Sequence, residues 1–224
     1  MSKNAISVVM RSKNEERWIG HAIQSVIEKL DNPEIIIVDN HSTDTTKKIA
    51  QSFKADPDIE NYGNYAELQI IEISDYSPGK ALNLGVQKAT YDYILIMSSH
   101  CVLTQFNLEE HLNDLNDHHA LFGNQIPVWE GKKITKRYIW SHFSNKSTTN
   151  MYSDLEKRYF LHNALAIYRK SILKKFPFDE NLTSKEDRYW ANKIIKKKMN
   201  FTYDPELIAE HQYTIHGNTW KGIA

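Results

Sequence analysis

The 224-residue sequence contains one cysteine, Cys101, and few of the residues that most often interrupt regular structure, with 8 glycines and 6 prolines. A single cysteine excludes an internal disulfide framework and any cysteine-rich zinc module, and it is typical of a protein in a reducing cytosol. The low glycine and proline content excludes collagen-like and low-complexity architectures. The sequence therefore predicts an ordinary folded chain.

The sequence also lacks an excess of either charge, because 28 lysines and arginines balance 28 aspartates and glutamates. A protein that binds duplex nucleic acid normally carries a basic excess, since neutralising phosphates supplies most of its non-specific affinity. We therefore expect no nucleic-acid partner.

Long apolar runs are missing as well. The apolar run at 5–10 is too short for the core of a signal peptide, and no later run approaches the roughly twenty apolar residues of a membrane-spanning helix. We expect a cytoplasmic chain whose only membrane association is peripheral, at the inner face.

The first half of the sequence alternates β-strand and helix patterns. The strands are expected at 5–10, 34–39, 68–74 and 91–99, and the helices at 15–30, 42–53 and 78–90. The second strand is a continuous apolar run, which is typical of a strand buried on both faces. Alternating strands and helices form right-handed βαβ units, so we predict an α/β fold with a parallel sheet covered on both sides.

The second half is less regular. Strands are expected at 120–129 and 161–169 and a helix at 185–199, whereas 131–150 is polar and aromatic without a clear period. That stretch is long for a loop in a compact domain, which indicates a functional or mobile segment. Because no repeat or linker is visible, we expect one domain over 1–224.

Polar segments follow each of the four expected parallel strands, at 11–16, 39–44, 77–80 and 98–101. Each segment alone is explained by helix capping, because serine, aspartate and asparagine are natural caps. Together they would meet at one edge, and open α/β sheets bind ligands beyond the carboxyl ends of their strands. We therefore predict a site there.

The segments ISVVMRSKNEERWIGHAIQSVI, EIIIVDNHSTDTTKKIA and PGKALNLGVQKATYDYILIMSSHC resemble successive N-terminal blocks of glycosyltransferase family 2. KEDRYWANKII, with the later His211, resembles its C-terminal block. The resemblance implies a GT-A-type, Rossmann-like fold, with a mostly parallel central sheet flanked by helices. It also implies a nucleotide-sugar donor and usually inversion. Residues 1–100 would then form the nucleotide-binding half and 101–224 the acceptor and catalytic half.

The resemblance assigns donor contacts to residues of the strand ends. Asp39 matches the aspartate that binds the nucleobase, and Arg11 and Glu15 match positions of the nucleoside pocket. Lys80 and Asn83 match positions near the nucleotide, where a cation at a helix N-terminus suits a diphosphate. The residues alone would favour a surface role for Lys80 and a capping role for Asn83.

The sequence departs from the family at Ser98-Ser99-His100, where an Asp-x-Asp usually holds Mg²⁺ or Mn²⁺ against the donor diphosphate. It resembles instead a rhamnosyltransferase-like bacterial subset with Ser-x-His. Three interpretations stay open. His100 and His211 hold a divalent metal such as Mn²⁺ or Mg²⁺, His100 contacts phosphate directly, or the site is inactive. In the first two, Ser98 and Ser99 lie beside the donor.

Glu186-Asp187 is the expected catalytic element. Inverting transfer needs a base that takes the proton of the acceptor hydroxyl, and Asp187 matches that base in the family, with Glu186 as its neighbour. Adjacent carboxylates tend to have raised pKa values, which favours proton uptake near neutrality. The simpler explanation is an acidic pair in the first turn of a helix.

Aromatic residues of the second half are candidates for acceptor binding, since sugar rings pack on aromatic faces. The candidates are Trp129, Trp140 and Trp190. They are equally well explained as core anchors.

The leading hypothesis is a glycosyltransferase that moves a sugar from a nucleoside-diphosphate donor to a hydroxyl of a glycan or lipid-linked glycan, in bacterial surface polysaccharide synthesis. One alternative is a metal-independent transferase that uses a nucleoside-monophosphate (CMP) sugar. Another is a non-catalytic subunit that binds a nucleotide sugar.

Overall fold

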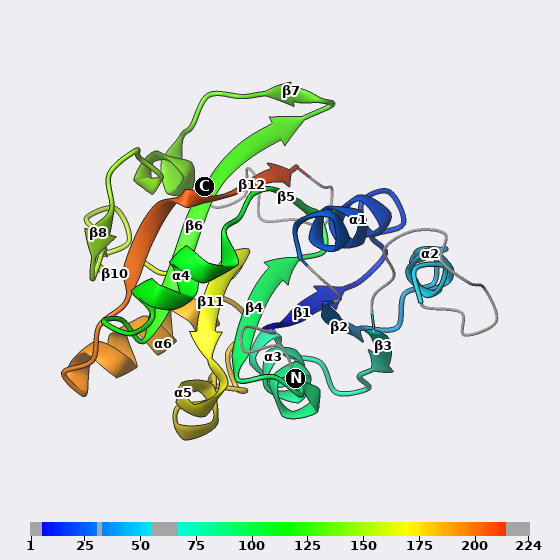
Figure 1. The fold of residues 1–224 in the computed structure, drawn as a ribbon, viewed down its shortest axis with the longest axis horizontal. Coiled ribbons are helices and arrows are strands. Elements are labelled where there is room, and N and C mark those ends of the chain that lie inside the picture. The colour runs from blue at the N-terminus through cyan, green and yellow to red at the C-terminus, as the bar shows by residue number, and fades with distance from the viewer. Residues whose placement is uncertain (1–5, 31–32, 55–66, 214–224) are drawn as a thin grey trace.

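The computed structural model describes residues 6–30, 33–54 and 67–213. Their main feature is a ten-stranded sheet with helices on both faces (Figure 1). Eight of its strands follow the order β3-β2-β1-β4-β11-β6-β12-β5, and the short β7 and β8 attach to β6 and β12. A separate two-stranded sheet pairs β9 with β10.

The first half contains the predicted βαβ units. The strands β1 (Ile6–Ser12), β2 (Glu34–Asp39), β3 (Glu67–Glu72) and β4 (Tyr93–Ser98) all pair in parallel. Between them lie the helices α1 (Ile19–Lys29), α2 (Thr46–Gln51) and α3 (Pro78–Lys88). All six residues of β2 are buried, as its apolar run predicts.

The second half completes the sheet with mixed pairing. Its principal strands are β5 (Cys101–Gln105), β6 (Ala120–Trp129), β11 (Leu165–Arg169) and β12 (Thr202–Gln212). The strand β11 lies antiparallel to both β4 and β6, whereas β12 is parallel to β6 and antiparallel to β5. The helices are α4 (Leu108–Asp114), α5 (Lys170–Lys175) and α6 (Glu186–Lys196).

The stretch without a clear period folds into short elements. These are β7 (Lys132–Lys133), the 3₁₀ helix η1 (Tyr138–His142), β8 (Thr148–Thr149), β9 (Tyr152–Ser153) and β10 (Arg158–Tyr159). Trp140 and Phe143 are buried in the core, so this stretch is anchored by aromatic side chains. Its elements are too short to leave a periodic pattern in the sequence.

Two hydrophobic cores lie on opposite faces of the sheet. Successive residues of β1 alternate between them, with Val9 in the core under α3, α5 and α6, and Met10 in the core under α1 and α4. Helix α3 approaches β1 closely because Gly85 has no side chain, and a Cβ there would lie 2.4 Å from Cγ1 of Val9. The sheet is thereby held between helices, and its strand ends stay free to form a site.

No helix within the described ranges has both the length and the apolar character needed to cross a membrane.

Candidate active site

A cleft of about 580 Å³ opens at the carboxyl ends of β1 and β4, as predicted for an α/β sheet. Its volume lies within the usual range of small-molecule sites. Two walls face each other across it. The first wall includes Arg11, Ser12, Lys13, Asn14, Glu15, Asn40, Tyr76, Pro78, Ser98, Ser99 and His100, and the second includes Tyr138, Ile139, Trp140, Glu156, His162, Asn163, Lys185, Glu186, Asp187, Arg188 and His211.

Asp39 is fully buried behind the first wall. One of its carboxylate oxygens accepts hydrogen bonds from the Ser12 hydroxyl (2.7 Å) and the Ser42 hydroxyl (2.6 Å), and the other accepts from the Ser42 backbone N–H (2.7 Å). The carboxylate therefore joins the loops after β1 and β2. The role of Asp39 in binding a nucleobase stays a prediction, because in this structure its oxygens bind protein groups.

His100 lies in the turn between β4 and β5 and connects the two walls. Its Nδ1 lies 2.9 Å from a carboxylate oxygen of Glu15, and its Nε2 lies 3.1 Å from Nε2 of His211 on β12. Ser98 and Ser99 precede it on the cleft surface. The structure thus brings together the two histidines that the sequence suggested as metal ligands.

His211 is buried among aromatic and polar groups. Its Nδ1 lies 2.9 Å from Oε1 of Gln125, and Trp140 packs edge-on against its ring. Burial, with smaller contributions from His100 and His162, lowers the pKa of His211 well below its ordinary value. The ring is therefore neutral near pH 7, as a metal ligand or hydrogen-bond acceptor must be.

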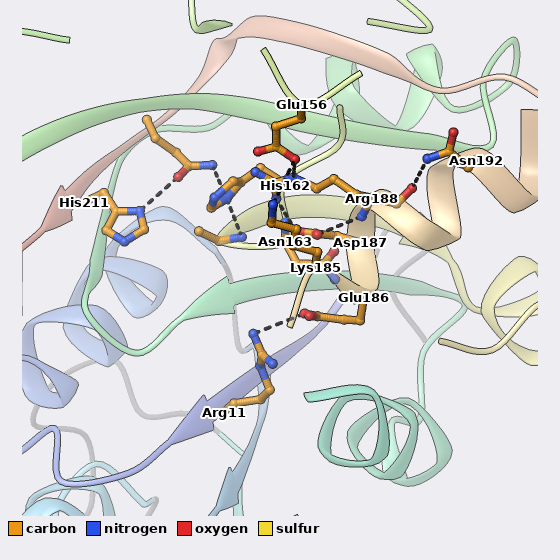
Figure 2. Close-up of polar contacts among 12 residues, drawn as sticks. Arg11, Glu156, His162, Asn163, Lys185, Glu186, Asp187, Arg188, Asn192 and His211 are labelled. Carbon is orange, nitrogen blue, oxygen red and sulfur yellow. Dashed lines mark hydrogen bonds and ion pairs between the residues drawn. The ribbon is translucent and has the colours of Figure 1, made fainter. Parts of the chain in front are cut away.

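The acidic pair opens α6 on the second wall, after Lys185, whose backbone adopts a left-handed conformation (φ 61°). Glu186 faces the first wall and forms an ion pair with Arg11 at 3.3 Å (Figure 2). Burial raises the pKa of Glu186, Arg11 opposes that change, and Asp187 reinforces it. The two walls therefore meet through an ion pair whose acid holds a proton more readily than an exposed glutamate.

Asp187 is held by three hydrogen bonds. One oxygen accepts from the Asn163 backbone N–H (2.9 Å) and from the Arg188 guanidinium (2.7 Å), and the other accepts from the Arg188 backbone N–H (2.8 Å). Figure 2 shows Asp187 between Asn163 and Arg188. The carboxylate is thus fixed at the cleft surface in one orientation.

Several cleft residues carry no recognisable sequence signal. Glu156 is brought in from the turn between β9 and β10, and its buried side chain lies 3.6 Å from the Arg188 guanidinium. His162 and Asn163 come from the segment that precedes β11, within 161–169, where the sequence pattern predicts only a strand. Only the folded chain places them beside α6.

Lys80 and Asn83 lie outside this cleft. Lys80 forms an ion pair with Asp75, and Asn83 donates to the Phe178 carbonyl and to Glu180, so that it ties α3 to the segment before α6. Both residues line a separate open depression. Their predicted proximity to the nucleotide therefore finds no support in the cleft geometry.

The three tryptophans suggested for acceptor binding have different positions. Trp140 lines the cleft, whereas Trp129 is exposed at the end of β6 and is not part of the cleft lining. The structure corrects the prediction that Trp190 binds the acceptor, because its side chain is buried against Tyr168 and donates to the Phe176 carbonyl. A ring enclosed in the core has no free face for a sugar.

Comparison with known proteins decides the family. A model described as glycosyl transferase family 2 matches residues 7–176, which is most of the chain. The chain belongs to this family.

Two curated relatives of this family 2 chain are named for teichoic acid biosynthesis and for O-antigen chain synthesis. It is 26% identical over 217 residues to the minor teichoic acid biosynthesis protein GgaB of Bacillus subtilis, covering 92% of this chain and 22% of that protein. It is 23% identical over 189 residues to the O-antigen chain rhamnosyltransferase WbaN of Salmonella anatum, covering 80% and 56% respectively. The chain thus spans only part of the length of these relatives.

Solved structures share the fold of this family 2 chain. Staphylococcus aureus TarS in complex with UDP-GlcNAc matches with a TM-score of 0.69 and 20% identity, covering 94% of this chain and 59% of that one. The mannosyltransferase PcManGT from Pyrobaculum calidifontis, in complex with GDP-Man and Mn²⁺, matches with a TM-score of 0.68 and 18% identity, covering 95% and 58%. These similarities confirm the predicted GT-A-type fold.

The candidate metal ligands of this family 2 member, His100 and His211, fit only some metals. Among the described residues, no group of three or more histidine, cysteine, aspartate or glutamate side chains is arranged to hold a metal ion. The two facing imidazoles of His100 and His211 suit a transition metal that takes its remaining ligands from a bound diphosphate. They do not form a protein site for Mg²⁺, which prefers oxygen ligands.

Proposed function

We propose that this chain transfers a sugar from a nucleoside-diphosphate donor to a hydroxyl of a glycan or lipid-linked glycan in bacterial surface polysaccharide synthesis. The observation that carries the proposal is the cleft itself, in which two buried carboxylates, Glu186 and Asp187, lie opposite the first wall. Membership of family 2 and the printed names of GgaB and WbaN support the reaction class and the polymer class. The UDP-GlcNAc complex of TarS supports a diphosphate donor.

In the proposed reaction, the first wall, from about residues 1–100, holds the nucleotide, and the second wall presents the acceptor. Asp187 takes the proton of the acceptor hydroxyl while that oxygen forms a bond to the anomeric carbon from the face opposite the leaving group. The bond from the anomeric carbon to the donor phosphate breaks, and the nucleoside diphosphate leaves with the electron pair. Configuration at the anomeric carbon is inverted.

Charged residues of the second wall support this proton transfer. Arg188 and the Asn163 backbone N–H fix the Asp187 carboxylate, so that it need not reorganise during the reaction. Burial and the neighbouring Asp187 raise the pKa of Glu186, so that Glu186 takes up a proton more readily than an exposed glutamate. A divalent metal held by His100 and His211 would neutralise charge on the diphosphate.

A metal-independent CMP-sugar transferase is the second candidate. The replacement of the usual Asp-x-Asp by Ser98-Ser99-His100 favours it, because a monophosphate donor has no diphosphate for a metal to bridge. In that case His100 and the two serines would contact the single phosphate directly. A lipid-linked acceptor would bring either enzyme to the inner face of the membrane.

A thermal-shift panel of UDP, GDP, dTDP, CDP and CMP, each with EDTA or Mn²⁺, tests the proposal. A ligand that binds only the folded state raises the melting temperature, so a selective shift identifies the donor class. We expect one diphosphate to stabilise the chain with Mn²⁺. A metal-independent response to CMP alone would favour the second candidate, and no response to any nucleotide would contradict both.

A second experiment separates an enzyme from a nucleotide-sugar-binding subunit. With the donor that the panel identifies, Asp187→Asn should abolish most nucleotide release while it leaves the thermal shift intact. The exposed Asp117→Asn variant is the matched control and should behave as wild type. Unchanged turnover in Asp187→Asn would contradict the assignment of the base.

A further inference from the structure

A continuous chain of hydrogen bonds connects residues of both cleft walls through the buried Gln125. It connects the Ala164 backbone N–H to His162, then to Gln125, His211 and His100, and ends at Glu15. Gln125 is fully buried on β6, and no motif in the sequence assigns it a role. The polarity of the hydrogen bonds from Ala164 to His211 can be worked out from one fixed point.

That fixed point is a backbone group. The Ala164 N–H lies 3.3 Å from Nδ1 of His162, and a backbone N–H can only donate. Nδ1 of His162 must therefore be the nitrogen with the lone pair, and the ring carries its proton on Nε2. Burial, followed by the charges of Arg188 and Arg11, lowers the pKa of His162 well below its ordinary value, which agrees with a neutral ring.

The polarity of His162 fixes the orientation of Gln125. The Gln125 atom that lies 3.1 Å from Nδ1 of His162 has to be a donor, so it is the amide nitrogen Nε2. The other end of the amide is then the carbonyl oxygen Oε1, which lies 2.9 Å from Nδ1 of His211. An oxygen acceptor at that distance requires a proton on Nδ1 of His211.

The proton on Nδ1 leaves the opposite nitrogen of His211 with the lone pair. That nitrogen, Nε2, faces Nε2 of His100 at 3.1 Å and lies at the cleft. Only a nitrogen with a free lone pair can bind a metal ion or accept a hydrogen bond from His100. Free histidine favours the other tautomer, with the proton on Nε2, so the protein has to impose this one.

We propose that Gln125 is a positioning residue that holds His211 in its Nδ1–H tautomer, so that the Nε2 lone pair faces His100 and the cleft. His162 supports this role. Because the Ala164 N–H donates to Nδ1 of His162, the Gln125 amide cannot flip and exchange its oxygen and nitrogen. The tautomer itself follows from the hydrogen bonds alone. Its consequence for nucleotide binding rests on the proposed function.

The tautomer is read directly from the ring nitrogens. Long-range ¹H–¹⁵N correlation spectra of ¹⁵N-labelled, metal-free protein distinguish a protonated nitrogen from one with a lone pair, and comparison with His211→Gln assigns the His211 signals. We expect Nδ1 of His211 to be protonated and Nε2 to be unprotonated. A proton on Nε2 of His211 in the wild-type protein would overturn the proposal, whether or not any variant folds.

Three substitutions test whether Gln125 is the cause. Gln125→Met removes the acceptor and should move the His211 proton to Nε2, whereas Gln125→Glu retains an oxygen acceptor and should keep it on Nδ1. Gln212→Met is the matched control, because Gln212 is also buried but lies outside the chain, and it should leave the spectrum unchanged. An unchanged His211 spectrum in folded Gln125→Met would overturn the proposal.

The consequence is measured by calorimetry with Mn²⁺ and UDP as probes. Loss of a residue that orients a metal ligand typically weakens binding about 10- to 100-fold, so we expect that loss in Gln125→Met, with Gln125→Glu retaining most of the affinity. Equal affinity in Gln125→Met and wild type would overturn the positioning role. If wild-type protein binds no nucleotide, the proposed function fails, and the tautomer spectra still decide the assignment of Gln125.

Discussion

Asp39, behind the first wall, and the Glu186-Asp187 pair of the second wall are held by different means. Behind the first wall, Asp39 is surrounded by neutral donors, two serine hydroxyls and one backbone N–H. On the second wall, Glu186 and Asp187 are each paired with an arginine, Arg11 and Arg188 respectively. The hydrogen bonds of Asp39 join two loops. The carboxylate–arginine pairs, in contrast, contain charges that change when a proton is taken up or a ligand binds.

This difference indicates a division of labour. A carboxylate enclosed by short hydrogen bonds to its own loops is suited to shaping a binding surface. A carboxylate such as Glu186, which faces an arginine across the cleft, is suited to chemistry, because its protonation depends on a neighbour that a substrate can displace. Burial raises the pKa of Glu186 and Arg11 opposes that rise, so a ligand that displaces Arg11 would raise the pKa further.

The comparison of the two walls is tested by substitution of one carboxylate in each, Asp187 and Asp39. The larger effect is expected at Asp187. Asp187→Asn removes the proposed base and should lower the transfer rate about 10²- to 10⁴-fold, which is the usual contribution of general base catalysis, with nucleotide affinity unchanged. Steady-state nucleotide release and calorimetry measure the two quantities. A loss of affinity instead of rate would show that the second wall binds the donor.

Asp39→Asn is the counterpart on the first wall. The amide nitrogen would face a hydroxyl or a backbone N–H that now donates to a carboxylate oxygen, which leaves buried donors without acceptors. We expect a loss of about 1–3 kcal/mol in the free energy of unfolding, together with weaker nucleotide binding. Chemical denaturation measures the first effect, and unchanged stability would contradict the structural role of Asp39.

A second pair of substitutions compares the packing of the two halves. A Cβ on Gly123 in β6 would lie 2.3 Å from the Leu207 carbonyl oxygen, whereas a Cβ on Gly20 in α1 would lie 3.2 Å from a movable methyl group of Ile49. Gly123→Ala should therefore destabilise the protein by about 1–3 kcal/mol, because two backbones must separate. Gly20→Ala should be close to neutral, since helix propensity offsets the tight contact. The denaturation midpoints of the two variants measure this difference. Equal destabilisation by Gly123→Ala and Gly20→Ala would contradict the expected difference in packing.

The first half was predictable because local sequence decides its structure. The apolar run within 34–39 predicts a strand buried on both faces, and the polar residues after it are then expected at the strand end. Helix α4 is absent from the expected elements, although Asn107 caps it and Glu109 and Glu110 occupy its first turn. Those signals were present, but the segment is only seven residues long and has no clear apolar period.

The second wall was predictable only in part. The resemblance pointed to Asp187 and His211, but no pattern pointed to Glu156, His162 or Gln125, whose contacts join residues far apart in the sequence. The sequence also does not show which of the three candidate tryptophans is enclosed in the core and which is exposed. Tertiary packing decides both matters.

Burial of the cleft histidines predicts a dependence of stability on pH. His162 and His211 stay neutral in the folded protein, because burial lowers their pKa, but each takes up a proton below about pH 6.5 in the unfolded chain. The unfolded state then binds more protons, so the free energy of unfolding should fall by roughly 1 kcal/mol per histidine between pH 6.5 and 5.5.

Glu186 acts in the opposite direction. Its raised pKa means that the folded state binds its proton more tightly, so its contribution to stability is lost as the pH rises above its ordinary value of 4.5. Denaturation of metal-free protein at pH 6.5 and 5.5 measures the sum. His162→Gln should reduce the slope that the histidines cause, and an unchanged slope would show that His162 is already protonated in the folded state.

The smallest expected effect tests where the first wall ends. Tyr76 and Pro78 line the cleft, so the N-terminus of α3 reaches its rim, but Lys80 turns away and pairs with Asp75. Lys13 belongs to the wall, and its ammonium group donates to the Asn40 carbonyl. With the nucleotide found in the thermal-shift panel, Lys13→Ala should weaken binding about tenfold, as loss of one charged contact to phosphate does.

Lys80→Ala should weaken binding less than about threefold, since it removes only a surface ion pair. Calorimetry on both variants compares them under one salt concentration. Equal losses would show that Lys80 leaves Asp75 for the nucleotide, as the family resemblance implies, and the first wall would then extend onto the first turn of α3. A loss confined to Lys13→Ala would place its boundary at Pro78, where the structure ends it.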